Sequence, residues 1–147
     1  MKTTIKKEVE EAFVKEAASP EHQNLVTGMM KYLEGQGWKI THAAGIDNYP
    51  RPDPVEDRIP DLVARKNGMK AYGEAERCEL LASKDTSDQL EKFSGRELKQ
   101  GDKKTNIPLF VCVPEDCIGE LRKIIAKPPL KGREIIPLAQ PKQKSKA

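Results

Sequence analysis

Three acidic residues, Asp61, Glu74 and Glu76, lie on either side of an Asn67-Gly68 dipeptide in this chain. Asn-Gly between two short apolar runs is the strongest local signal for a two-residue β-hairpin loop. With Asn67 and Gly68 as the loop, Asp61 lies directly opposite Glu74. Glu76 falls on the same face because side chains alternate along a strand. The sequence therefore predicts three carboxylates on one patch of sheet.

Such a patch of carboxylates could bind a metal ion. Like charges placed opposite each other on a sheet are destabilising. Preorganised carboxylate oxygens are, however, what a hard divalent cation such as Mg2+ or Mn2+ prefers. The alternative is that the acids are solvated side chains on an exposed hairpin, which is a common arrangement. Both interpretations are open at this point, and the surrounding elements must be considered.

The composition is that of one globular domain. The chain has 147 residues, of which 37% are hydrophobic and 33% charged. No apolar run approaches the ~18 residues of a membrane span. The N-terminus lacks an apolar signal segment, so a cytoplasmic location is expected. Cys78, Cys112 and Cys117 form no C-x-x-C pair, and their odd number predicts buried or incidental thiols rather than a disulfide framework or a four-cysteine metal site.

The charge is unevenly distributed along the chain. Residues 127–147 carry a net charge of +5, and the remainder carries a net charge of −2. A basic tail is consistent with a polyanionic partner, and equally with an ordinary solvated terminus. Tyr49, Arg51 and Arg58 in a proline-rich loop are candidate contacts to nucleic acid.

Apolar spacing and capping signals predict an alternation of helices and strands. Ser19 can cap a helix that has Pro20 in its first turn, and an uncharged run over 107–113 predicts a strand covered on both faces, as parallel strands are. The predicted elements are helix 4–18, helix 20–34, strand 38–43, loop 45–58, hairpin 59–77, a helix from Asp85 with Leu90, Phe93 and Leu98 on one side, strand 107–113, a helix opened by Pro114 and stopped by Pro128-Pro129, and a short edge strand at Ile135-Ile136.

This order predicts an α/β fold with a mixed central sheet flanked by helices. We divide the chain into an N-terminal helix over 1–18, a domain over 19–127 and a basic, partly disordered tail over 128–147. The second face of the predicted hairpin is small and apolar and suits packing against a helix; it consists of Leu62, Ala64, Ala71, Gly73 and Ala75.

The element order and the placement of the acids resemble the PD-(D/E)xK nuclease superfamily. Its restriction endonuclease-like αβββαβα core would here carry an extra N-terminal helix. Pro60-Asp61 matches the first half of the family motif, and Glu74-Ala75-Glu76 matches the second half except that Glu76 stands where the family has Lys. The resemblance covers about Pro20 to Lys127.

The resemblance implies a Mg2+- or Mn2+-dependent endonuclease acting on DNA. Asp61, Glu74 and the Ala75 backbone carbonyl would bind the metal, whose bound water would attack a phosphodiester. Glu76 would serve as general base or as ligand to a second ion. A homodimer would be needed to cut both strands of a duplex. The alternatives are a catalytically inactive nuclease-fold protein that binds nucleic acid or has a structural role, and an unrelated α/β adaptor.

The resemblance adds two candidate catalytic residues. Glu21 would be an accessory acid aimed at the metal, and the alternative is a helix-dipole interaction. Gln89, followed by Phe93, resembles the Gln-x-x-x-Tyr motif of RecB-type nucleases, and the alternative is a polar residue beside a core Phe. Lys84 could replace the missing Lys charge. Of the two histidines, His22 is the better functional candidate, although surface or core roles are favoured for both.

Overall fold

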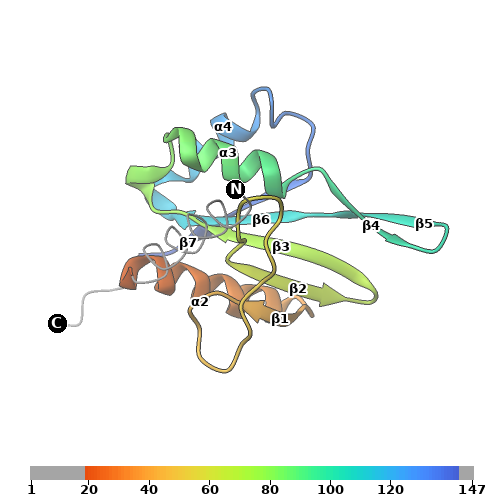
Figure 1. Ribbon diagram of the computed structural model, residues 1–147. Coiled ribbons are helices and arrows are strands. Elements are labelled where there is room, and N and C mark those ends of the chain that lie inside the picture. Colours follow the sequence, from red (N-terminus) through yellow and green to blue (C-terminus); the bar gives the residue numbers. More distant parts are fainter. Residues whose placement is uncertain (1–18, 143–147) are drawn as a thin grey trace, which may run out of the picture.

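The computed structural model describes residues 19–142 and shows a five-stranded mixed sheet between helices (Figure 1). The elements are α2 (Pro20–Gly35), β1 (Lys39–Ala43), β2 (Leu62–Lys66), β3 (Met69–Ala75), α3 (Lys84–Phe93), β4 (Arg96–Gln100), β5 (Lys103–Ile107), β6 (Leu109–Pro114), α4 (Ile118–Ile125) and β7 (Ile135–Gln140). The sheet order is β1-β2-β3-β6-β7, with α2 on one face and α3 and α4 on the other. The helix predicted over 4–18 lies outside the described residues.

The predicted α/β class is confirmed, whereas a restriction endonuclease-like topology stays a prediction. The observed order matches the predicted one from α2 to α3, and it then adds a second hairpin, β4–β5, before β6 and α4. Between Ser19 and Lys142, no helix combines the length and the apolar character that crossing a membrane requires.

The β2–β3 hairpin has the predicted register. Lys66 pairs with Met69 and Leu62 with Gly73, so Asn67 and Gly68 form the two-residue loop. Both loop residues have positive φ, 49° at Asn67 and 79° at Gly68, as the tight turn compatible with strand twist requires. The turn therefore sets which side chains of the two strands face each other.

Helix α2 begins as its sequence predicts. The Ser19 side chain accepts a hydrogen bond from the His22 backbone N–H at 3.4 Å, and Pro20 occupies the first turn. Its apolar stripe packs on the small residues of β2 and β3. Gly73 allows this close approach, since a Cβ there would lie 2.6 Å from Leu62 and 3.0 Å from the Met29 sulfur.

The buried strand β6 is parallel to both its neighbours, β3 and β7, as its uncharged sequence predicts. The edge strand predicted at Ile135-Ile136 is confirmed and extends to Gln140. This part of the segment 128–147, which we predicted as a tail, is therefore part of the sheet. Hydrogen bonds between parallel strands need long-range contacts, which a basic composition does not reveal.

The β4–β5 hairpin is a correction to the predicted helix. Leu98 lies in β4 and not on α3, because the helix ends at Phe93 and Gly95 follows with φ 70°. Gly101 reverses the chain between the two strands with φ 62°. This hairpin extends away from the five-stranded sheet (Figure 1). Its mostly polar sequence hid the strand alternation of Leu98, Thr105 and Ile107.

The prediction of unpaired cysteines was wrong for two of the three. Cys78 and Cys117 form a disulfide, with their Cα atoms 5.7 Å apart. Cys78 follows β3 and Cys117 follows β6, and these strands are parallel neighbours, so the segments after their ends meet. Cys112 is a buried free thiol, and burial raises its pKa to about 12. An odd cysteine count could not show which two residues the topology joins.

We predict that Gly73→Ala lowers the free energy of unfolding by about 1–3 kcal/mol, because the added methyl overpacks the contact between α2 and the sheet. Gly119→Ala in α4 is the matched control, since a Cβ there has no neighbour within 4 Å. That control should leave stability unchanged or raise it by up to about 1 kcal/mol. Urea unfolding of both variants checks this, and equal midpoints would contradict the close packing at Gly73.

Candidate metal centre

Asp61 lies at the entrance to β2, where the chain leaves the proline-rich loop. Its backbone N–H donates at 3.0 Å to the carbonyl of Gly73, the residue that already pairs with Leu62. Asp61 and Leu62 thus both face Gly73, as at a β-bulge, and the regular pairing of β2 with β3 ends at Leu62. The predicted position of Asp61 directly opposite Glu74 stays a prediction, although the two side chains offer ligand atoms within 4.8 Å of each other. Pro60 is buried and has no N–H to donate, which suits the point where the chain enters the sheet.

The Asp61 carboxylate is held in place by two contacts from different elements. Its Oδ2 atom accepts a hydrogen bond from the Ala75 backbone N–H at 2.7 Å and lies 3.0 Å from His22 Nε2. Ala75 is thus shown to contribute its amide, and a metal-binding role for its carbonyl stays a prediction. The two contacts join β2, β3 and the first turn of α2 at one carboxylate.

The acidic side chains are buried, not solvated. Asp61 is 5% exposed, Glu74 1%, Glu76 2% and His22 3%. Burying a charge is unfavourable unless it is paired and hydrogen-bonded or coordinates a metal. The alternative of solvated acids on an exposed hairpin is therefore wrong. His22, Asp61 and Glu74 each offer a ligand atom, and these three atoms lie within 4.8 Å of one another.

The environment of Asp61 favours its ionised form. Burial alone raises the pKa of Asp61. Hydrogen bonds with Glu74 and His22, the positive charge of the His22 imidazolium and the Ala75 amide lower this pKa, and together they hold it below its ordinary value of 3.8. The cluster therefore keeps a carboxylate charge in a buried place at neutral pH.

Glu76 lies one residue beyond β3 at the same end of the sheet. Its backbone N–H donates to the Cys112 carbonyl at 3.0 Å, so the parallel β3–β6 pairing continues to this residue. Its side chain is buried but is not one of the three that lie within 4.8 Å of one another. Its predicted role as general base or ligand to a second ion stays a prediction.

His22 lies in the cluster, whereas its neighbour Glu21 is exposed. Its burial agrees with the favoured core role for this histidine, and metal binding by His22 stays a prediction. The helical spacing carried the missing signal, because His22 falls on the stripe of buried α2 residues at intervals of three, four, seven and eleven. Those residues are Leu25, Val26, Met29 and Leu33. Glu21 lies off that stripe, so its predicted role as an accessory acid gains no support.

Gln89 and Phe93 lie on the buried side of α3, 6% and 0% exposed. The Phe93 ring packs 6.4 Å from the Tyr72 ring of β3, measured between centroids. The two residues therefore face the sheet, as neighbours one helical turn apart do. A catalytic role for Gln89 stays a prediction. Lys84 is exposed at the first residue of α3.

The proline-rich loop is tied to α3 by ion pairs. Arg58 Nη2 lies 2.5 Å from Asp85 Oδ1, and its Nε lies 3.2 Å from Asp88 Oδ2. Burial lowers the pKa of Arg58, but these two acids outweigh that effect and raise it. Arg58, a candidate contact to nucleic acid from the sequence, thus has two carboxylate partners within the fold.

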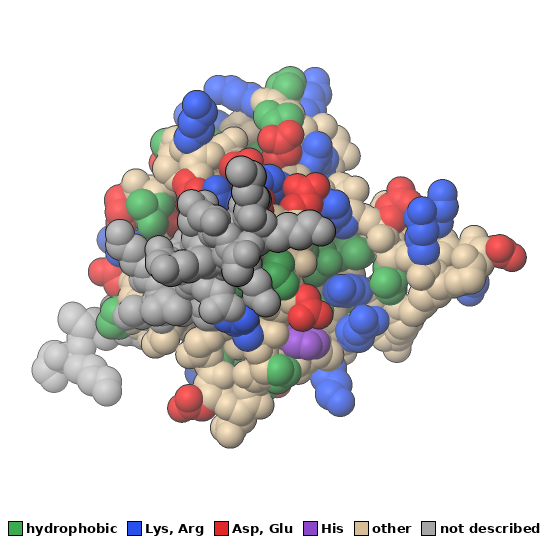
Figure 2. All heavy atoms as spheres, viewed as in Figure 1, with side chains coloured by type: hydrophobic (Ala, Val, Ile, Leu, Met, Phe, Trp, Pro, Cys, Tyr) green, Lys and Arg blue, Asp and Glu red, His purple; other side chains and the backbone are tan. Residues whose placement is uncertain are grey.

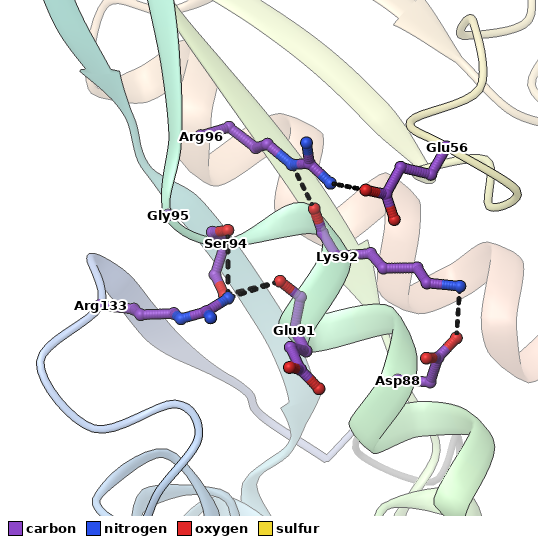
Figure 3. Close-up of a pocket in the computed structure, with 8 residues that line it drawn as sticks. All are labelled: Glu56, Asp88, Glu91, Lys92, Ser94, Gly95, Arg96 and Arg133. Carbon is purple, nitrogen blue, oxygen red and sulfur yellow. Dashed lines mark hydrogen bonds and ion pairs between the residues drawn. The ribbon is translucent and has the colours of Figure 1, made fainter.

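An open hollow of about 480 Å³ lies between the loop, α3 and the start of β4 (Figure 3). Four of its charged side chains form ion pairs, because Glu56 pairs with Arg96 at 3.1 Å and Asp88 with Lys92 at 3.1 Å. Arg133 donates to the Glu91 carbonyl and the Ser94 hydroxyl. We interpret this hollow as a region where ion pairs and hydrogen bonds connect neighbouring elements, and not as the functional site.

Two comparisons with known proteins give no match. A scan against protein-family models gives no match, and a search of curated proteins finds no similar sequence.

We predict that the buried Asp61 carboxylate makes stability depend on pH. Because its pKa is lower in the folded chain than in the unfolded chain, Asp61 stabilises the fold above its ordinary value of 3.8. This contribution is lost as the pH falls through the folded-state pKa. With chelator present to keep the protein metal-free, the free energy of unfolding of the wild type should fall more than that of Asp61→Asn between about pH 6 and about pH 3. Urea unfolding across this range measures the difference.

The control for this pH experiment is Asp47→Asn, which removes an exposed carboxylate from the proline-rich loop. It should follow the wild-type profile. Identical pH profiles for wild type and Asp61→Asn would contradict the role given to the buried carboxylate.

Proposed function

We propose that this protein is a divalent-metal-dependent endonuclease acting on DNA. The observation that carries the proposal is the buried cluster of His22, Asp61 and Glu74, whose ligand atoms lie within 4.8 Å of one another. Glu76 adds a further buried acid at the same end of the sheet. A net negative, oxygen-rich cluster inside a protein is unusual without a function that uses it.

The donor set fits a Mg2+ or Mn2+ ion. Two carboxylates suit hard cations, and an additional imidazole is well accepted by Mn2+. Asp61 and Glu74 would bind the ion directly. His22 could act in one of two ways. It could be a third metal ligand, or it could hydrogen-bond to the Asp61 carboxylate and orient it toward the metal. Its 3.0 Å contact to Asp61 Oδ2 favours the orienting role.

The chain's own residues would position the ion and handle a proton. The Ala75 amide and His22 hold one Asp61 oxygen, which fixes the orientation of this carboxylate. A bound ion would supply an activated water and offset charge developing on the phosphate. Glu76 would accept a proton from the attacking water, as a buried carboxylate near its reaction partner can.

The fold is compatible with the resemblance to PD-(D/E)xK nucleases. Pro60-Asp61 directly precedes β2, and Glu74-Ala75 ends β3 with Glu76 one residue beyond it. The site holds one cluster per chain among the described residues, so a homodimer would be needed to cut both strands of a duplex.

We predict that the wild-type protein binds Mn2+, with measurable heat in calorimetry. Asp61→Asn and Glu74→Gln should abolish this heat, because each removes a carboxylate ligand. His22→Gln should weaken binding by roughly 10–100-fold if the histidine orients Asp61. Glu97→Gln, which changes an exposed acid of β4, is the matched control and should bind as wild type does. Mn2+ heat that survives in both ligand variants would overturn the site.

We predict metal-dependent cleavage of a panel of linear, branched and single-stranded DNA substrates. Activity should require Mg2+ or Mn2+, disappear in chelator and disappear in Asp61→Asn. Glu76→Gln should keep metal binding while cleavage falls by roughly 10²–10⁴-fold, the range for loss of a general base. Gel analysis of end-labelled substrates measures both variants. Full activity in Asp61→Asn would contradict the proposal.

A second candidate is a nuclease-fold protein without catalysis. The buried Glu76, in place of the Lys of the family motif, favours it. Nucleic-acid binding without heat on metal addition and without cleavage would support this candidate over the enzyme.

A further inference from the structure

The strands that carry the acid pair also carry a basic pair. Cross-strand pairs follow one another along β2 and β3, and alternate positions share a face of the sheet. At the entrance to β2, Asp61 and Glu74 offer ligand atoms within 4.8 Å of each other. The next two pairs are Val63 with Tyr72 and Arg65 with Lys70. The same ribbon thus runs from acidic through apolar to basic, with the basic pair beside the Asn67-Gly68 turn.

Strand β1 extends the basic pair into a row. Lys39 is the direct partner of Arg65, so Lys39, Arg65 and Lys70 lie side by side on three adjacent strands. Adjacent strands are about 4.8 Å apart, so the row covers roughly 10 Å. Like charges directly opposite each other are destabilising. A ligand of opposite charge would offset the repulsion within the row.

The charge of this row is not neutralised within the fold. No ion pair between residues 19 and 142 includes Lys39, Arg65 or Lys70. Lys39 and Arg65 are exposed, and Lys70 Nζ lies 5.1 Å from the centre of the Tyr72 ring. The basic residues that tie the proline-rich loop to α3 are different, because each of them has a carboxylate partner.

The surface around the row is open. A hollow of about 180 Å³ lies beside it, and Asp53 is the one acid among the residues that line it. Those residues are His42, Asp53, Pro54, Val55, Val63, Arg65, Lys70 and Tyr72. Figure 2 shows lysine and arginine side chains gathered beside a histidine on the face turned to the viewer, over strands β1 to β3 of Figure 1.

We propose that Lys39, Arg65 and Lys70 form a docking face for the sugar-phosphate backbone of duplex DNA. This inference rests on the proposed function, since it assigns that site its substrate-binding surface. Cations spread over roughly 10 Å exceed the reach of a single phosphate group and suit a chain of phosphates. The row lies four residues along β2 and β3 from the acid pair, or roughly 13 Å. That length corresponds to about four base steps along the axis of B-DNA.

The test is a comparison of two triple variants that remove the same charge from different surfaces. The docking-face variant is Lys39→Gln/Arg65→Gln/Lys70→Gln. The control variant changes exposed lysines of α2, α4 and the segment before β7; it is Lys31→Gln/Lys123→Gln/Lys131→Gln. Binding of each to a fluorescently labelled DNA duplex is measured by anisotropy over a series of salt concentrations, with chelator present to prevent cleavage.

The docking-face variant should lose at least about tenfold in affinity at moderate salt. The slope of its plot of log affinity against log salt should become shallower by about 2–3 units, since each phosphate contact contributes about 0.9 to that slope. The control should stay within about twofold of wild type. Equal losses in both variants, or wild-type binding by the docking-face variant, would overturn the inference. Binding to vesicles of anionic lipid without binding to duplex DNA would overturn it too.

Two further measurements keep the result interpretable. The docking-face variant should unfold at the same temperature as wild type or higher, because it removes opposed like charges. If it does unfold, the exposed pair Lys39→Gln/Arg65→Gln replaces it in the same assay.

Binding in chelator does not require the metal centre. Loss of binding in the docking-face variant therefore supports the inference even if no cleavage is found, and metal-dependent cleavage with unchanged binding would overturn the inference alone.

Discussion

The register of the β2–β3 hairpin is the constraint on which the rest of the structure depends. A slip of one residue would move every side chain of a strand to the other face. The positive φ angles of Asn67 and Gly68 prevent such a slip at the turn. At the open end, the 2.7 Å bond from the Ala75 amide to Asp61 Oδ2 ties the same two strands together. A backbone turn and a buried carboxylate thus enforce one pairing, and this pairing brings Asp61 close to Glu74.

The packing of α2 then completes the cluster. Small residues on the opposite face of the hairpin let the helix approach, with Gly73 the position where a Cβ would collide. The helix that packs there begins at the Ser19 cap, so its first turn lies beside the start of β2. His22 reaches Asp61 from that turn and stabilises a charge that burial alone would disfavour. Helix α2 therefore contributes both to the packing of the core and to the charge balance of the cluster.

Local chemistry accounts for what the sequence could predict. The Asn-Gly turn, the Ser-Pro cap and the uncharged run of β6 each act over a few residues, and each prediction agrees with the structure. The disulfide between Cys78 and Cys117 was missed because it depends on the parallel pairing of two distant strands. The β4–β5 hairpin was missed because its pattern is mostly polar. His22 lay within reach of sequence reasoning, since its helical spacing matches the buried stripe of α2.

The hairpin brings like charges together at both ends, which a stable sheet would avoid. Asp61 and Glu74 lie close together at one end, and Arg65 opposes Lys70 at the other. Between them, Val63 and Tyr72 are buried against α3 and α4, and this apolar pair supplies the burial that such a face contributes to stability. Natural sequences break local rules of this kind chiefly at functional sites, where another part of the fold offsets the loss. Neighbouring like charges of both signs, at the two ends of one ribbon, are what a surface that binds a metal and a polyanion would need.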